Sequence, residues 1–241
     1  MDLGLQDKII LVTGGATGIG EGISRVLAAE GAVPVIIGQR EADNKQTVAS
    51  IKAAGGNADS FKAELTLPEQ CNAAIAFVVE KYGRIDSLVN NAGVNDGIGL
   101  ANSNYDDFMH LLHGNVVPYF LMAHHALPYF IRSKGSIVNI SSKIAEISQD
   151  NTSAYPGANS GPNALTREWA VELLPYAIRV NAIIVAKTAT PLDERSIKTF
   201  PHAEEVANIV AFLLSSKSSH TTGQLVRVNG GYVHLNRVVT F

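Results

Sequence analysis

The chain has 241 residues, of which 46% are hydrophobic and 17% charged, and its formal net charge is −3 at pH 7. This is the composition of an ordinary globular protein, and the length suits one domain, residues 1–241, that needs no disulfide or metal for its core. Lysine and arginine form no basic block, which argues against a nucleic-acid partner, and the apolar runs are too short to cross a membrane. No signal sequence precedes Lys8, so we expect a cytoplasmic protein.

Short apolar runs alternate with longer helical patterns, and this alternation predicts a parallel sheet. The seven expected strands are Ile9–Thr13, Val33–Ile37, Ser60–Ala63, Ser87–Asn90, Ser136–Ile140, Arg179–Ile184 and Leu225–Val228. The expected helices are Gly20–Glu30, Glu41–Ala54, Pro68–Tyr82, Tyr105–Arg132, Ser153–Leu174 and Ala203–Leu214. Continuous runs such as Ile9–Val12 are typical of strands covered on both faces, so right-handed crossovers predict a doubly wound sheet flanked by helices.

A glycine-rich turn connects the first expected strand to the first helix. Gly14 and Gly18 have no side chain to keep a pyrophosphate from the backbone N–H groups, and Gly20 allows the helix to pack close to the strand. The N-terminus of the helix adds partial positive charge. The turn therefore predicts a dinucleotide site, in which we also place Thr17 and Ile19.

We interpret the single cysteine and four of the histidines as structural residues rather than as ligands or reactive groups. Cys71 falls in an apolar helical pattern, which predicts a buried thiol. His110, His113, His124 and His125 share one helical stretch, but no cysteine or carboxylate accompanies them at ligand spacing, so we predict no metal site. Core packing alone explains the apolar residues of that stretch.

Five motifs in order resemble the short-chain dehydrogenase/reductase family over nearly the whole chain. They are the G-x-x-x-G-x-G turn, Asn90–Gly93, Asn115, Ser142 with Tyr155, and Ile178–Ala182. The resemblance implies a Rossmann-type fold and an NAD(P)-dependent oxidoreductase. Further segments look like the L-fucose dehydrogenase branch, which implies a sugar or similar secondary alcohol as substrate; these are residues 95–100, 141–143, 165–171, 220–223 and 230–232.

The resemblance also implies roles for individual residues. Tyr155 would be the acid/base, Ser142 its hydrogen-bonding companion and Asn115 a support. The remaining residues implied to contact the cofactor are Glu64, Leu65, Asn91, Ala92, Gly93, Tyr155, Asn159, Val185, Thr188 and Thr190.

Asn159 stands where the family has a lysine, one helical turn after Tyr155. A phenol has a pKa of about 10 and is a poor base at neutral pH, and in the family the lysine supplies the positive charge that lowers this pKa. An asparagine offers hydrogen bonds but no charge. One alternative is that Lys143 or Lys187 replaces the missing cation; the other, which we favour, is that both are solvated loop residues.

Two more departures lie nearby. Pro162 falls inside the expected helix, where a missing N–H and a ring clash require a kink or a later start. The segment from Leu192 to Ala203 is shorter than the substrate-covering loop of the family, which would leave the pocket more open to water.

Cofactor choice depends on the residues after the second strand. An acidic side chain at the position of Gln39 would bond the adenosine ribose and select NAD, and Gln39 is not acidic. Arg40 can pair with the extra phosphate of NADP. We therefore expect NAD(P), with NADP slightly favoured; the alternative is that Arg40 is a structural surface residue.

Three functions remain open at the level of sequence. The first is an oxidoreductase acting on a small-molecule substrate, the second an impaired family member that binds nucleotide as a scaffold subunit, and the third an interaction protein whose glycine turn is vestigial. In the family, the helices before and bearing Tyr155 form a dimer seam, so the resemblance implies a homodimer or homotetramer.

Overall fold

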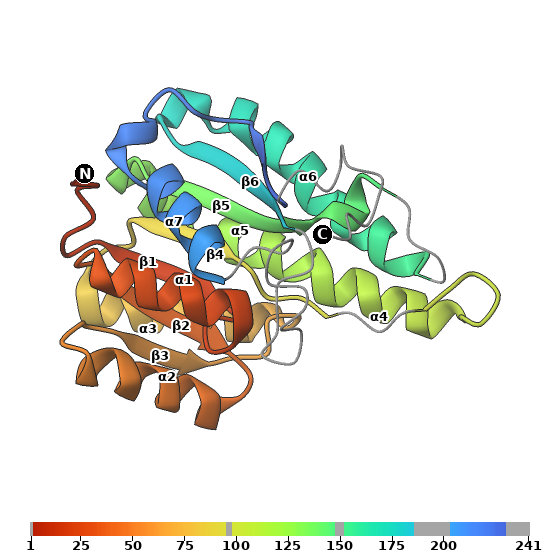
Figure 1. The fold of residues 1–241 in the computed structure, drawn as a ribbon, viewed down its shortest axis with the longest axis horizontal. Helices are drawn as coiled ribbons and strands as arrows, with labels where there is room; N and C mark the ends of the chain where they lie inside the picture. Colours follow the sequence, from red (N-terminus) through yellow and green to blue (C-terminus); the bar gives the residue numbers. More distant parts are fainter. Residues whose placement is uncertain (1, 95–97, 148–151, 186–202, 230–241) are drawn as a thin grey trace, which may run out of the picture.

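The computed structural model describes residues 2–94, 98–147, 152–185 and 203–229, and a parallel sheet forms its centre (Figure 1). The sheet has seven strands in the order β3-β2-β1-β4-β5-β6-β7, and every neighbouring pair is parallel. The strands are β1 (Ile9–Thr13), β2 (Val33–Gly38), β3 (Asp59–Lys62), β4 (Ser87–Asn90), β5 (Ser136–Ser142), β6 (Arg179–Val185) and β7 (Leu225–Val228). The predicted doubly wound, Rossmann-type sheet is confirmed.

Helices cover both faces of the sheet, as the buried strands require. They are α1 (Gly18–Ala29), α2 (Glu41–Ala53), α3 (Pro68–Tyr82), α4 (Tyr105–Asn115), α5 (Val117–Ser133), α6 (Ala154–Glu172) and α7 (Ala203–Leu214). Helices α1 and α7 lie side by side on one face (Figure 1) and pack on Ile10 and Val12. Helices α3, α5 and α6 pack on the other face, against Ile9 and Leu11. Alternate residues of β1 therefore enter two separate cores.

The prediction of a single helix over residues 105–132 is wrong. Helix α4 ends at Asn115, and α5 begins at Val117 after the junction residue Val116. Pro118 explains the break, because proline has no N–H to continue the hydrogen bonds of α4 but is well accommodated in the first turn of a new helix. The break allows α4 and α5 to have different neighbours.

Pro162 does not delay the start of its helix. Helix α6 begins at Ala154 and runs through Pro162 to Glu172. The Pro162 carbonyl accepts a hydrogen bond of 2.7 Å from the Thr166 hydroxyl in the next turn. The turn bearing Tyr155 is thus helical, and Tyr155 and Asn159 lie one turn apart on it.

Cys71 is fully buried, as predicted, and its thiol donates to the Leu65 carbonyl over 3.3 Å. Burial, assisted by Glu64 and Glu69, raises the pKa of the thiol to about 11. Within the described ranges, no helix combines the length and apolarity needed to cross a membrane.

Candidate active site

The glycine turn adopts a backbone that only glycine accommodates easily. Gly14 and Gly18 have φ values of +61° and +56°, in the left-handed region. A Cβ on Gly20 would lie 2.1 Å from the Gly14 carbonyl oxygen, so a side chain there would force α1 away from the turn. A Cβ on Gly18 would meet nothing within 4 Å, so the turn faces open space at the start of α1.

Thr13 fixes this turn to the neighbouring strand. Its hydroxyl is fully buried and accepts hydrogen bonds from the backbone N–H groups of Asn91 (2.8 Å) and Ala92 (3.1 Å). The Asn91 side chain donates in return to the carbonyls of Thr13 and Gly14 over 3.1 and 3.2 Å. The carboxyl ends of β1 and β4 are therefore held together, although the sequence did not mark Thr13 as a site residue.

A cleft of about 850 Å³ opens above these strand ends. Its wall contains ten of the residues expected to contact the cofactor: Gly14, Thr17, Ile19, Gln39, Arg40, Glu64, Leu65, Asn91, Ala92 and Gly93. Gly18 and Gly20 shape the turn without lining the cleft. The carboxyl edge of a doubly wound sheet is where such folds bind nucleotides.

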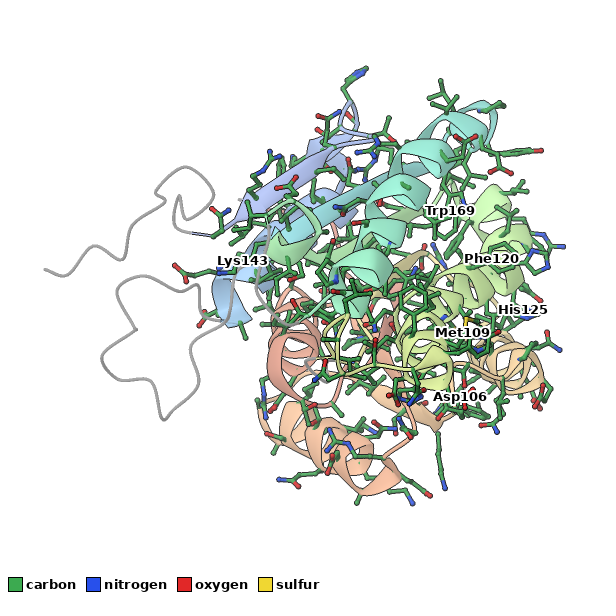
Figure 2. All side chains as sticks on the ribbon, turned by 90° about the vertical axis from the view of Figure 1, so that its right-hand side faces the viewer. Asp106, Met109, Phe120, His125, Lys143 and Trp169 are labelled. Carbon is green, nitrogen blue, oxygen red and sulfur yellow. The ribbon has the colours of Figure 1, made fainter. Side chains whose placement is uncertain are left out.

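Helix α4 supplies a wall of the cleft that the sequence reasoning missed. Asp106, Met109, His110 and His113 all line it, and Figure 2 shows Asp106 and Met109 on α4. The spacing i, i+3, i+4 and i+7 places these side chains on one face of a helix, and this spacing was the signal available in the sequence. His110 and His113 are thus cleft residues, whereas His124 in α5 stacks on Phe120 with a centroid separation of 5.5 Å. Within the described ranges, no three metal-ligating side chains gather.

Arg40 lies at the end of the cleft that follows β2. Its guanidinium donates to the Thr17 hydroxyl over 3.2 Å and pairs with Asp43 at 3.0 Å. These contacts hold the Arg40 guanidinium beside Thr17, in the glycine turn. Glu64 has its carboxylate occupied by Thr66, whose N–H and hydroxyl donate to it over 3.2 and 3.0 Å.

Ser142 and Tyr155 meet farther along the same edge. Ser142 ends β5 and accepts a hydrogen bond from the Ile144 N–H over 3.3 Å, while Tyr155 lies in the first turn of α6. Burial raises the pKa of the Tyr155 phenol above its ordinary value, and hydrogen bonding with Ser142 and Asn159 offsets this only in part. The pair predicted from the sequence is brought together, but in an environment that favours the neutral phenol.

Asn159 is only 6% exposed and tied to the backbone around it. Its side-chain amide donates to the Tyr155 carbonyl over 3.1 Å, and its own carbonyl accepts from the Ser141 hydroxyl over 3.2 Å. The Asn159 side chain also lowers the pKa of the Tyr155 phenol, although by less than burial raises it. Asn159 therefore links β5 to the first turns of α6.

Asn115 holds the segment that follows β4. Its amide donates to the carbonyls of Val94 (3.0 Å) and Leu111 (2.9 Å), and its oxygen accepts from the Val94 N–H over 3.1 Å. A Cβ on Gly93 would lie 2.6 Å from that oxygen, so the close contact requires glycine. Asn115 supports the wall of the cleft through this loop.

Several sequence predictions fall at or beyond the limits of the described chain. Val185 ends β6 and is paired in register with Ser142. Thr188, Thr190, Lys187 and the short segment that begins at Leu192 lie outside the described residues. Lys143 begins a short 3₁₀ turn, Lys143–Ala145, directly after Ser142 (Figure 2).

The residues present fit a dinucleotide. The left-handed glycines, the open space at Gly18 and the start of α1 form a cradle for a diphosphate, and the cleft beside it is large enough for an adenosine group.

Comparison with known proteins agrees with this geometry. The model of the short chain dehydrogenase family matches residues 8–199. A 3-oxoacyl-[acyl-carrier-protein] reductase of Thermotoga maritima is 33% identical, over 95% of this chain and 99% of its own. A cyclohexanol dehydrogenase of an Acinetobacter species is 32% identical, over 94% and 95%. The crystal structure of Cj0485 dehydrogenase superposes with a TM-score of 0.90 at 35% identity, over the full length of both chains. The chain belongs to the short-chain dehydrogenase/reductase family of oxidoreductases.

Proposed function

We propose that the protein is an NAD(P)-dependent oxidoreductase that interconverts a secondary alcohol and its ketone. The observation that carries this proposal is the hydrogen-bonded pair of Ser142 and Tyr155 on the sheet edge that also carries the nucleotide cleft. The bound nicotinamide would supply or accept the hydride. Tyr155 would exchange a proton with the substrate oxygen, since a positioned acid or base contributes about 10²–10⁴-fold to such a step.

The other site residues would serve binding and orientation. Gly14, Thr17, Gly18 and Ile19 would hold the diphosphate, Glu64 and Leu65 would flank the adenine, and Val185, Thr188 and Thr190 would lie beside the nicotinamide. Ser142 would orient the substrate oxygen and Tyr155, and Asn115 would keep the Gly93–Val94 loop in place.

The proposed substrate is a hydroxyl group on a saturated ring, or the corresponding ketone. A relative is named for cyclohexanol, which supports a ring alcohol. The resemblance of several segments to L-fucose dehydrogenases supports a pyranose sugar such as L-fucose, which is also a saturated ring bearing secondary alcohols. We therefore propose this shared chemistry, with the sugar as the specific candidate.

We propose NADP as the slightly preferred cofactor. Gln39 provides no carboxylate to bond the adenosine ribose, and Arg40 is held at the cleft mouth by Thr17 and Asp43. A guanidinium in that place suits a phosphate on the ribose.

A second candidate is a catalytically impaired member that binds nucleotide as a scaffold subunit, and Asn159 favours it. Turnover assays with a panel of cycloalkanols, sugars and steroids, run in both directions with both cofactors, separate the two functions. Turnover that is lost in Tyr155→Phe supports the enzyme. Nucleotide binding without turnover on any member of the panel supports the scaffold.

The variant Asn159→Lys tests whether the missing charge limits turnover. If proton transfer is the weak step, we expect turnover to rise by ~10²-fold or more. Unchanged turnover, with nucleotide affinity intact, contradicts this explanation.

The proposed assembly is a homodimer or homotetramer built through α4, α5 and α6. Exposed aromatic side chains on α4 and α5 support it: Tyr105, Phe108 and Phe120 are 75%, 41% and 49% exposed, and Figure 2 shows Phe120 on this side of the molecule. Sedimentation of the purified protein checks the mass. The cytoplasmic location stays a prediction, which fractionation of the source cells tests.

A further inference from the structure

We propose that a second cleft, on the edge of the sheet opposite to the nucleotide cleft, binds a small phosphate-bearing anion. This cleft has a volume of about 670 Å³ and lies where β1, β4, β5 and β6 begin, on the left of Figure 1. A cavity of this size is typical of a small-molecule site. No described residue lines both clefts, so the site is independent of the proposed oxidoreductase function.

The wall of the second cleft has an excess of positive charge. Among the described residues, Lys8, Lys134 and Arg179 contribute three positive charges to it, and Asp86 contributes the one negative charge. The net charge is +2 without His220, which also lines the cleft, whereas the formal net charge of the whole chain is −3. The positive charge is therefore a local property of this cleft.

Asp86 does not neutralise the other cations, because its carboxylate already has its partners. The residue is 4% exposed. One of its carboxylate oxygens binds the Lys8 ammonium at 3.3 Å and the Arg84 guanidinium, and the other accepts the Ile9 N–H over 2.9 Å. The remaining positive charge of the wall has no carboxylate partner among the described residues.

Lys134 has a backbone conformation that is costly for a lysine. It caps α5 with φ +53°, in the left-handed region where a helix usually ends on glycine, although Gly135 follows directly. The Phe130 carbonyl at this helix end already accepts the N–H groups of Lys134 and Gly135, so the Lys134 ammonium is not needed to close the helix. Strained residues of this kind are a sign of function, and here the strained residue is an exposed lysine in the wall of the cleft.

Hydroxyl groups make up much of the remaining wall. They belong to Ser87, Ser133, Ser136, Ser215, Ser216, Ser219 and Thr222. The Ser133 hydroxyl oxygen is buried and has no hydrogen-bond partner among the described protein groups. A buried hydroxyl without a partner is unfavourable, and a ligand oxygen that accepts its proton would remove that cost. Both the charge and the hydroxyls of the cleft therefore suit an anion.

Arg179 has a structural role that decides which anion fits. Its guanidinium donates to the carbonyls of Leu213 (2.8 Å) and Ser215 (3.1 Å) at the end of α7, and to the Ser218 hydroxyl (2.9 Å). A helix C-terminus attracts a cation in this way. Because the planar fork of Arg179 is occupied, the described wall offers no free bidentate donor for a carboxylate, whereas an ammonium and hydroxyls suit the oxygens of a phosphate. The expected ligand is therefore a phosphate-bearing small molecule.

Isothermal calorimetry of the wild-type protein with inorganic pyrophosphate is the first test. We expect saturable binding with a Kd of about 1 mM or tighter, which weakens as NaCl screens the charges. Orthophosphate and glycerol 3-phosphate, titrated in the same way, show whether the cleft takes free phosphate or a phosphate ester, and saturable binding of either supports the site. No saturable binding of any of the three, or citrate binding as tightly as the best of them, overturns the proposal.

The variant Lys134→Gly tests the site without threatening the fold. It removes the ammonium, and glycine suits the left-handed backbone, so we expect a Tm at least equal to that of the wild type and a loss of about 10-fold in pyrophosphate affinity. Asp7→Gly is the matched control for the backbone, because Asp7 has φ +59° and lines neither cleft. Lys52→Gln, at an exposed position of α2, is the control for charge. Both controls should keep the affinity within about twofold, and an unchanged affinity in Lys134→Gly overturns the proposal.

A second pair of titrations separates this cleft from the nucleotide cleft, since pyrophosphate resembles the diphosphate of a dinucleotide. With NADPH present in excess, pyrophosphate should still bind the wild-type protein, and Lys134→Gly should leave the Kd of NADPH unchanged. Pyrophosphate binding that is lost in the presence of NADPH and kept in Lys134→Gly puts the anion in the glycine turn and overturns this inference, while the nucleotide site stands. If NADPH itself does not bind, the proposed function fails, but weaker pyrophosphate binding in Lys134→Gly than in the wild type still supports the second cleft.

Discussion

Single residues decide whether this chain can hold a nucleotide. Gly20 is the clearest case, because a Cβ there would lie 2.1 Å from the backbone oxygen of Gly14, which cannot move without moving the whole turn. The absence of a side chain at Gly20 thus allows the turn to form a backbone cradle that opens toward the cleft.

Gly20→Ala should therefore weaken both the fold and the site. We expect an overpacking cost of about 1–3 kcal/mol in the free energy of unfolding and a loss of at least ~10-fold in nucleotide affinity. Chemical denaturation and isothermal calorimetry measure the two effects. Gly157→Ala is the matched control, since a Cβ there meets nothing within 4 Å and alanine is the better helix residue by roughly 0.5–1 kcal/mol. Equal behaviour of the two variants would contradict the role of Gly20.

Arg40 makes the cofactor preference testable at the same scale. Arg40→Ala should raise the Kd of NADPH by about 10- to 100-fold, because it removes a charge-assisted hydrogen bond to the ribose phosphate that contributes about 1.5–3 kcal/mol. The Kd of NADH should change by less than about threefold, because NADH has no such phosphate. Arg25→Ala is the control, because Arg25 pairs with Glu21 on α1 and is not in the cleft wall. Parallel losses for NADPH and NADH in Arg40→Ala would show that the arginine does not read the ribose phosphate.

At the scale of elements, the site depends on how strand ends are joined. The carboxyl ends of β1 and β4 share one hydroxyl, since Thr13 accepts the N–H groups of both Asn91 and Ala92. The glycine turn and the Asn91–Gly93 wall of the cleft therefore move as one unit.

Thr13→Val keeps the shape of the side chain but leaves the N–H groups of Asn91 and Ala92 without their hydrogen-bond acceptor. A buried group left without a partner costs about 1–3 kcal/mol, so we expect a clear drop in unfolding free energy and weaker nucleotide binding. Thr17→Val is the control for stability, because Thr17 is exposed and, among the described contacts, its hydroxyl accepts a bond only from the side chain of Arg40. Full stability of Thr13→Val in urea unfolding would contradict the link between the strands.

Elements also show where sequence reasoning succeeds and where it stops. Strands β1 and β4 have the bounds that the sequence predicted, because short buried runs that end at turn formers such as Gly14 and Asn91 have few alternatives. The joined helix over residues 105–132 was wrong, since the apolar pattern continues through Val116 and Pro118 was not read as a new start. The face of α4 that lines the cleft was missed for a related reason, because periodicity does not say which neighbour a helix face meets.

At the scale of the molecule, the proposed nucleotide site and the proposed site of chemistry lie at different strands of one sheet edge. The cleft over β1, β2 and β4 suits the nucleotide, and the Ser142–Tyr155 pair at β5 and α6 suits the substrate. The motifs predicted which strand ends carry these residues, and the strand order agrees with that part of the prediction. The direction of the Tyr155 pKa shift could not be predicted from the sequence, because it depends on burial and on contacts that only the folded chain supplies.

Nucleotide-dependent thermal unfolding of the wild-type protein tests the central claim most directly. The account predicts that NADPH or NADH at about 100 times its Kd stabilises the folded state by about 2.7 kcal/mol, seen as a rise in Tm, because only the folded glycine turn binds it. An unchanged Tm with both saturating cofactors, on folded protein, would contradict the claim that this chain is a nucleotide-dependent oxidoreductase.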